Sequence, residues 1–284
     1  MGSVMAMSAV PVGSQRAWSS AFADLAGGWR QRQLWAHLGW QDIRQRYRRS
    51  LLGPIWISIT MAVTAIALGV LYAGLFGNDL AVQLPYILVG FIIWGFISGC
   101  ISEGAEVFTS NVGLITHLPA PLSVHVYRLV WRQVLFFAHN LLVYAVMLVV
   151  FPQDLHWSDV TAIPAVLLLA VNGAWVALLI GIVTTRFRDL LPITQSIVQL
   201  AFFLTPIVWI YEDLLNSPNP EIAERARLAE LNPFLHFIEI LRRPMLGQPQ
   251  ELRHWVVVGI ITVVGWAVTL VVLRQYRARV SYWV

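Results

Sequence analysis

The sequence of 284 residues contains no lysine, because all 19 of its basic residues are arginine. A P-loop needs a lysine at the β- and γ-phosphates, a protein kinase needs a strand lysine, and a Schiff-base enzyme needs a side-chain amine. The chain by itself therefore cannot use any of these routes, and a nucleotide-driven step requires another subunit.

Cysteine is almost absent too. Cys100 is the single cysteine and lies in an apolar run, which excludes a disulfide within the chain and a cysteine-based zinc site. The seven histidines are scattered without HExxH or another paired-ligand spacing, so neither a metal nor a cofactor is expected. No catalytic residue is predicted.

Charge is scarce: 12% of the residues are charged and 58% are hydrophobic, with a mean hydropathy of +0.67. A soluble globule of this length needs more polar surface, so the sequence predicts an all-α, polytopic membrane protein. The apolar runs predict six spans at 54–76, 85–101, 124–151, 160–185, 191–210 and 255–273.

The distribution of arginine predicts the orientation of these spans. Arginine is concentrated before the first span, in the loops 109–132 and 185–190, and in the C-terminal tail. The loops 77–83 and 152–159 contain none. By the positive-inside rule both termini are expected in the cytoplasm. Because the arginines flank apolar spans, no nucleic-acid partner is predicted.

Three regions are distinguished along the chain: a flexible cytoplasmic tail at 1–21, an amphipathic interfacial segment at 22–53 and the six-span domain at 54–284. The segment 111–121 is interpreted as a short helix at the membrane surface, and the apolar run 231–241, too short to span, as a re-entrant outer segment between spans five and six. The interfacial helix is assigned Trp40, Arg44, Arg46, Tyr47, Arg48 and Arg49.

A few polar residues interrupt the spans. Glu103 and Glu106 share a helical face, and ion pairs with Arg128 or Arg132 are favoured over a proton relay. His139 and Asn140 are interpreted as contacts between helices.

Another set of residues suits the lining of a channel. Trp94 and Trp175 lie near the middle of their spans, where they either pack or stack against sugar rings, and Gln195 and Gln199 can wet one helical face. Pro206 within the fifth predicted span is either a hinge or a static bend.

Four stretches carry a family resemblance. They are QDIRQRYRRSLLGPIW at 41–56, SNVGLITH at 110–117, RFRDL at 186–190, and TPIVW at 205–209 followed by LNPF at 231–234. The chain resembles the permease subunit of ABC transporters that export polysaccharides and polyol phosphates, from about residue 34 to the C-terminus. One departure is His117 followed by Leu118-Pro119, where the family pattern usually has lysine and Phe-Pro. A phosphate-sensing role of that lysine is therefore not carried over.

The resemblance implies a homodimer bound to two ABC ATPase subunits, which hold ATP and magnesium. A channel between the two copies would carry a polyprenyl-linked polysaccharide. The lipid of a bacterial plasma membrane would surround them. The cytoplasmic gate or coupling contacts are assigned to Asn111, Leu114, Ile115, His117, Arg186, Arg188 and Asp189.

Among glycans, the all-arginine usage is typical of a high-GC genome and favours, by analogy, a lipid-linked galactan of an actinobacterial cell wall. Two other classes stay open. A membrane-embedded glycan or acyl transferase would build its site from the outer segment 211–254, and a secondary transporter would couple to protons through Glu103 and Glu106, although no inverted repeat is seen.

Overall fold

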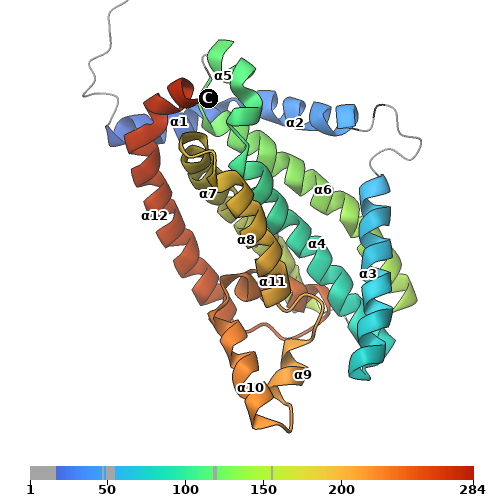
Figure 1. The fold of residues 1–284 in the computed structure, drawn as a ribbon. Coiled ribbons are helices and arrows are strands. Elements are labelled where there is room, and N and C mark those ends of the chain that lie inside the picture. Colours follow the sequence, from blue (N-terminus) through green and yellow to red (C-terminus); the bar gives the residue numbers. More distant parts are fainter. Residues whose placement is uncertain (1–16, 47, 49–54, 118–119, 155) are drawn as a thin grey trace, which may run out of the picture.

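The described part of the chain is helical throughout. The computed structural model describes residues 17–284 except 47, 49–54, 118–119 and 155, and these residues contain no strand. Figure 1 shows the arrangement of the helices. In chain order they are α1 (Trp18–Arg30), α2 (Arg32–Arg46), α3 (Ile55–Phe76), α4 (Leu80–Ala105), η2 (Thr109–Asn111), α5 (Val112–His117), α6 (Ser123–Val150), η3 (Trp157–Thr161), α7 (Ala162–Arg186), α8 (Leu190–Leu204), α9 (Tyr211–Leu215), α10 (Pro220–Arg227), η4 (Leu228–Leu231), α11 (Pro233–Met245) and α12 (Leu252–Trp283).

Five helical stretches of the described chain are long and apolar enough to cross a membrane. They are α3, α4, α6, α12 and the continuous stretch Trp157–Arg186, which joins η3 to α7. The predicted class, an all-α polytopic membrane protein, is confirmed.

The predicted fifth span, 191–210, is the one that differs. α8 has 15 residues and ends at Leu204, because Thr205 is extended (φ −95°, ψ 137°) in front of Pro206. The ring of a proline disfavours the helical region for the residue before it. Pro206 therefore terminates the helix and is not a hinge within a span. At about 1.5 Å per residue α8 reaches ~22 Å, less than the ~30 Å of a hydrocarbon core.

The chain nevertheless reaches the opposite end of the bundle along α8 and the residues that follow, and α12 returns to the end that carries α5 (Figure 1). The described residues thus contain five helices of membrane-spanning length and one shorter apolar helix where six spans were predicted.

Local signals fix the helix ends. The predicted turn after the first span is present, with Gly77 at φ 72°, a left-handed conformation that glycine adopts without steric cost. Asp79 then caps α4 by accepting a hydrogen bond from the backbone N–H of Ala81 at 2.9 Å. Asn232 caps α11 in the same way, with Pro233 in its first turn.

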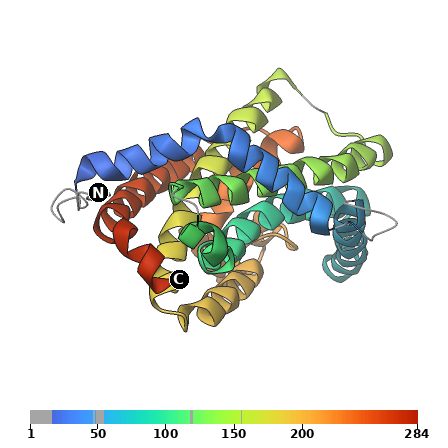
Figure 2. The ribbon, with the colours of Figure 1, turned by 90° about the horizontal axis from the view of Figure 1, so that it is seen from above.

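α1 and α2 lie across one end of the bundle instead of entering it, as the side and top views show (Figures 1 and 2). α1 packs on α6 and α12, and α2 packs on α6. The helical spacing of Trp40, Ile43, Tyr47 and Leu51 predicts one lipid-facing stripe. Of these residues Trp40 is 47% exposed, whereas Ile43 is 1% exposed and faces the protein. The other members of the stripe, Tyr47 and Leu51, and the predicted interfacial Arg49, lie outside the described residues.

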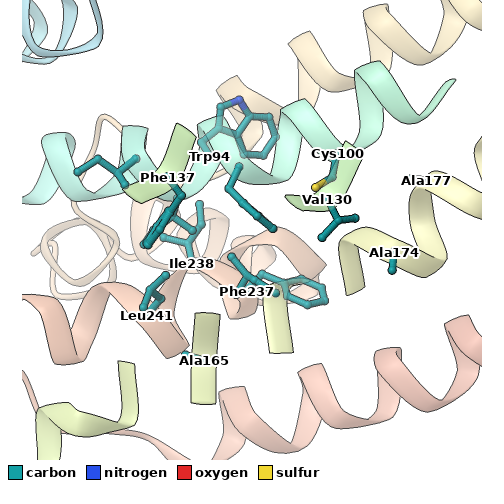
Figure 3. Packing of buried hydrophobic residues seen from close by; sticks show 14 of the residues in the cluster. Trp94, Cys100, Val130, Phe137, Ala165, Ala174, Ala177, Phe237, Ile238 and Leu241 are labelled. Carbon is teal, nitrogen blue, oxygen red and sulfur yellow. The ribbon is translucent and has the colours of Figure 1, made fainter. Parts of the chain in front are cut away.

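The core forms around α4, which packs against α3, α6, α7, α8 and α11. Figure 3 shows its close packing, with Trp94, Phe137 and Phe237 from three helices. α11 contains most of the predicted re-entrant run, and its side chains from Leu235 to Arg242 are all buried. It enters from η4 and leaves toward α12 without crossing the bundle (Figure 1).

The two ends of the bundle differ in charge. The end with α1, α2 and α5, called the Arg-rich end below, is formed by α1, α2, the end of α4, the start of α6, the α7–α8 junction and the end of α12 (Figure 1). These segments carry eleven arginines with described side chains, Arg30, Arg32, Arg44, Arg48, Arg128, Arg132, Arg186, Arg188, Arg274, Arg277 and Arg279, and five acidic residues, Asp24, Asp42, Glu103, Glu106 and Asp189. The segments of the opposite end carry ten acidic residues, Asp79, Asp154, Asp159, Glu212, Asp213, Glu221, Glu224, Glu230, Glu239 and Glu251, and five arginines, Arg225, Arg227, Arg242, Arg243 and Arg253. The Arg-rich end is the one that the positive-inside rule assigns to the cytoplasm.

Candidate functional site

An open groove of about 500 Å³ runs between α4 and α8. It is called the α4–α8 groove, and it is lined by Trp94, Ser98, Ser102, Gln195, Ser196, Val198, Gln199, Phe202 and Phe203. None of these nine side chains is charged. The structure thus brings together three of the four residues predicted to line a channel, namely Trp94, Gln195 and Gln199.

The polar groups of this groove come from helical spacing. Trp94, Ser98 and Ser102 repeat every four residues on α4, and Gln195 and Gln199 do so on α8, so each set shares one face. Both glutamines are exposed and make no side-chain hydrogen bond to described residues. Their amides can therefore donate to and accept from a passing molecule.

Aromatic rings form one wall of the groove. The ring of Trp94 lies 6.0 Å from that of Phe202 and 5.4 Å from that of Phe234, both edge-on or tilted. Trp94 is 7% exposed, so it presents an edge to the groove and not a whole face. On its other side a second hollow of about 410 Å³ includes Thr60 and Thr64 of α3. The wall is therefore flanked by hydroxyl groups on one side and amides on the other.

Trp175, the fourth predicted lining residue, lies elsewhere. Its indole N–H donates to Oδ1 of Asn172 at 2.7 Å, and Nδ2 of Asn172 donates to Thr262 on α12 at 2.8 Å. The ring also packs against Gly265. Trp175 borders an apolar cavity of about 450 Å³ between α4, α7, α8, α11 and α12. It joins α7 to α12 and does not line the α4–α8 groove.

Asp42 of α2 organises the Arg-rich end. It accepts hydrogen bonds from Nε and Nη2 of Arg128 at 2.8 and 2.5 Å and from Nη1 of Arg132 at 2.7 Å. Arg132 also pairs with Glu103, which confirms the predicted ion pair. Partial burial would raise the pKa of the Asp42 carboxyl, but the two guanidinium groups outweigh it and hold this pKa below its usual value.

Asp24 of α1 is a second anchor at this end. Its carboxylate is 3% exposed and accepts from the backbone N–H groups of Leu122 and Ser123 at 3.2 and 3.0 Å. It thereby caps the start of α6, where the helix dipole favours a negative charge. Arg277 of α12 lies 3.4 Å away. Sequence reasoning missed this residue, because its partners are about a hundred positions away.

The predicted gate residues lie on and beside α5, which projects beyond α1 and α2 (Figure 1). Oδ1 of Asn111 accepts from Nη1 of Arg128 at 3.0 Å, which ties the base of α5 to α6. Leu114 and Ile115 are half-buried, and His117 is exposed. α5 also contacts the far end of α12.

The second predicted contact, between α7 and α8, lies at the same end. Arg186, Arg188 and Asp189 are all exposed. The guanidinium of Arg186 lies 5.2 Å from the ring centroid of Trp283, near the end of α12. The structure therefore places both predicted contact segments on the Arg-rich end.

A buried ionic cluster on α11 was not predicted. Arg242 is fully buried and its Nη1 donates to Glu239 at 3.2 Å. Arg243 reaches Glu239 at 3.0 Å, Glu212 at 3.1 Å and Glu251 at 2.7 Å. The sequence signal was the spacing of Glu239, Arg242 and Arg243 at i, i+3 and i+4. The cluster fastens α11 to α9 and to the start of α12.

No group of three or more His, Cys, Asp or Glu side chains within the described ranges could hold a metal ion.

Comparison with known proteins gives two matches. The family model described as ABC-2 type transporter matches residues 33–246. The O-antigen export system permease protein RfbA of Myxococcus xanthus is 24% identical over 196 residues, which cover 69% of this chain and 73% of that protein. The matched range includes α2 to α11, and with them the groove, α5 and the segment after α7.

Proposed function

The chain belongs to the ABC-2 type transporter family, and from this premise we propose that it is the permease of an exporter that moves a lipid-linked cell-surface polysaccharide out of the cytoplasm. It is a membrane permease with no catalytic activity of its own, and the ATPase is a separate subunit. The absence of lysine from the sequence agrees with this division of labour.

The α4–α8 groove is the observation that carries the proposal. Its lining combines amides, hydroxyl groups and aromatic edges without a charge. Sugars offer hydroxyl groups that both donate and accept, together with apolar ring faces, so such a surface suits a glycan better than an ion. The groove is open along its length in one copy, and we propose that a second copy closes it into a channel.

The Arg-rich end supplies the surface for the partner. α5 and the segment 186–189, which lies near the end of α12, are both on this end, and each copy of the permease would bind one ATPase there. ATP binding can change the channel only through contacts that differ between its two states. Because Asp42, Arg128 and Asn111 connect α2, α6 and the base of α5, a movement of α5 is transmitted to α6.

The kind of glycan follows from the relative and the resemblance. RfbA is named for O-antigen export, which supports a polysaccharide on a polyprenyl carrier as the substrate class, with teichoic acid as a further member. A galactan of an actinobacterial cell wall is the narrowest form of the proposal, and it rests on the all-arginine composition and the family resemblance alone.

Transport by the reconstituted complex tests the proposal. The chain would be purified with the ABC ATPase encoded beside it, placed in vesicles and supplied with a polyprenyl-linked glycan and ATP. We expect a stable complex, ATP-dependent appearance of glycan on the far side, and loss of transport in the ATPase variant that binds but does not hydrolyse ATP.

Other outcomes point to the rival classes. Transport driven by a proton gradient without ATP, and abolished by an uncoupler, would indicate a secondary transporter. Transfer of sugar or acyl groups by the chain alone would indicate an enzyme. The pairing of Glu103 with Arg132 already argues against a proton relay, since the carboxylate is held by a permanent cation.

A further inference from the structure

A polar cavity of about 310 Å³ lies at the Arg-rich end, where the end of α4, η2 and the first turns of α6 meet. The lining residues that matter are Glu103, Glu106, Asn111, His125, Arg128 and Arg132. The cavity adjoins the base of α5, because the lining residue Asn111 directly precedes that helix.

The two arginines of the cavity are already engaged. Nε and Nη2 of Arg128 donate to Asp42 and its Nη1 donates to Asn111. Arg132 gives Nη1 to Asp42 and Nη2 to Glu103. Two carboxylates therefore balance two guanidinium groups, and only Nε of Arg132 is buried there without an acceptor among the described residues.

The groups that stay available are mainly acceptors. Glu106 is exposed, and its carboxylate makes no ion pair or hydrogen bond to another described residue. His125 is 5% exposed, and its Nδ1 is buried without a partner in the described chain. In the tautomer with the proton on Nε2, this Nδ1 is an acceptor.

The charges decide which ligand fits. Asp42 and Glu103 neutralise the two arginines. The carboxylate of Glu106 therefore gives the cavity a net charge of −1. An anion would meet the two carboxylates of Glu103 and Glu106, whereas an ammonium or guanidinium group would find acceptors in Glu106 and in Nδ1 of His125. A cavity of this size admits the end of one long side chain.

We infer that this cavity receives a lysine or arginine side chain of the ATP-hydrolysing partner, which binds Glu106 and Nδ1 of His125. The inference rests on the proposed function, because it presumes that partner. The walls of the cavity come from the ends of α4 and α6. The inserted cation therefore connects the partner directly to these two helices, in addition to the contact between the partner and α5. It would favour the state in which these two ends are closest.

Binding of the purified ATPase to the full-length chain in detergent tests this inference. Glu106→Gln keeps the shape of an exposed side chain and removes its charge, and Glu106→Arg reverses the charge. We expect Glu106→Gln to weaken binding about tenfold and Glu106→Arg to weaken it further, because each removes one member of an interfacial charge pair. The difference from wild type should shrink at high salt. Glu224→Gln, an exposed acid at the opposite end, is the matched control and should bind as wild type does.

A second measurement locates the contact. Cys100 is 2% exposed, so Glu106→Cys would introduce the one accessible thiol of the described chain. A maleimide should label this thiol in the free permease and not in the complex. If the wild-type chain binds the ATPase but both charge variants bind equally well and the introduced thiol is labelled in the complex, the inference is wrong and the proposed function stands. If the wild-type chain binds no ATPase at all, the proposed function fails, and this inference fails with it.

Discussion

The guanidinium carbon of Arg242 lies 3.8 Å from the centroid of the Tyr86 ring, in a buried part of the bundle near the end opposite α5. The ring stabilises the cation from one side, and Glu239 neutralises it from the other. Nε and Nη2 of Arg242 have no hydrogen-bond acceptor in the described chain. Tyr86 therefore takes the place of a second acidic partner of Arg242. This contact holds α11 against α4.

Removal of Arg242 should destabilise the protein strongly. Arg242→Met keeps the length of the side chain but leaves the buried Glu239 with Arg243 as its only cation, and breaking a buried pair in this way costs about 3 kcal/mol. Thermal unfolding in detergent measures the loss. Arg225→Met is the control, because the Arg225–Glu221 pair is exposed at both side chains (79% and 78%), and it should change stability by no more than about 0.5 kcal/mol. Equal effects of the two substitutions would contradict this account of α11.

Asp42→Asn should loosen α2 from α6. The substitution leaves Arg128 and Arg132 without their shared carboxylate, and we expect a loss of about 2 kcal/mol. Hydrogen exchange should become faster in α2 and at the start of α6, and stay unchanged in α11 at the opposite end. Unchanged protection of α2 would show that the ion pairs do not hold it in place.

The same carboxylate predicts a pH dependence. The folded state lowers the pKa of Asp42, so its stabilising contribution is complete above the unfolded pKa of about 4 and is lost as the pH falls through the lower folded value. The difference in unfolding midpoint between wild type and Asp42→Asn should therefore be constant from about pH 5 to 7 and shrink below about pH 4. A difference that grows on acidification would have the wrong sign for this mechanism.

Close packing between α4 and α7 predicts an effect at a glycine. A Cβ at Gly104 would lie 2.7 Å from Cα of Ala177, a backbone atom that cannot move aside. Gly104→Ala should separate the two helices and cost about 2 kcal/mol. Gly259→Ala on α12 is the matched control, since a Cβ there meets nothing within 4 Å, and it should stabilise the protein by up to about 1 kcal/mol. The unfolding temperatures of the two variants measure these changes in stability.

The groove predicts a transport defect without a stability defect. Combined Gln195→Leu and Gln199→Leu substitutions remove two exposed amides, and we expect glycan transport to fall about tenfold. The unfolding temperature should not fall. Leu200→Ala, an exposed apolar position on the same helix (62% exposed), should transport normally. Normal transport by the double variant would exclude this face of α8 from the passage.

The sequence was sufficient for features that depend on composition and local spacing. Long uncharged runs predicted the spans, and arginine counts predicted which loops gather at one end. Gly77, Asn78 and Asp79 marked a turn whose chemistry is local. The i, i+4 repeats on α4 and α8 placed Trp94, Gln195 and Gln199 on faces that the fold brings together.

Features that depend on contacts between residues far apart in the sequence could not be predicted from it. Hydropathy alone could not show that Thr205-Pro206 ends α8, because the apolar run continues past the proline. Trp175 lies in an apolar span just as Trp94 does, and only the position of α12 decides that it packs against Gly265. Asp24 and Asp42 look like ordinary surface acids until α6 is placed beside α1 and α2.

The unequal charges at the two ends make the folded chain an electric dipole along the bundle. A bacterial membrane holds its interior negative, and each elementary charge that crosses the full potential changes the energy by about 2.3 kcal/mol per 100 mV. The end with α1, α2 and α5 holds more arginines than acidic residues, and the opposite end holds more acidic residues than arginines. In the orientation that the positive-inside rule predicts, the field draws the excess positive charge inward and the excess negative charge outward. An inverted copy would hold both excesses against the potential, so the membrane potential favours the predicted orientation.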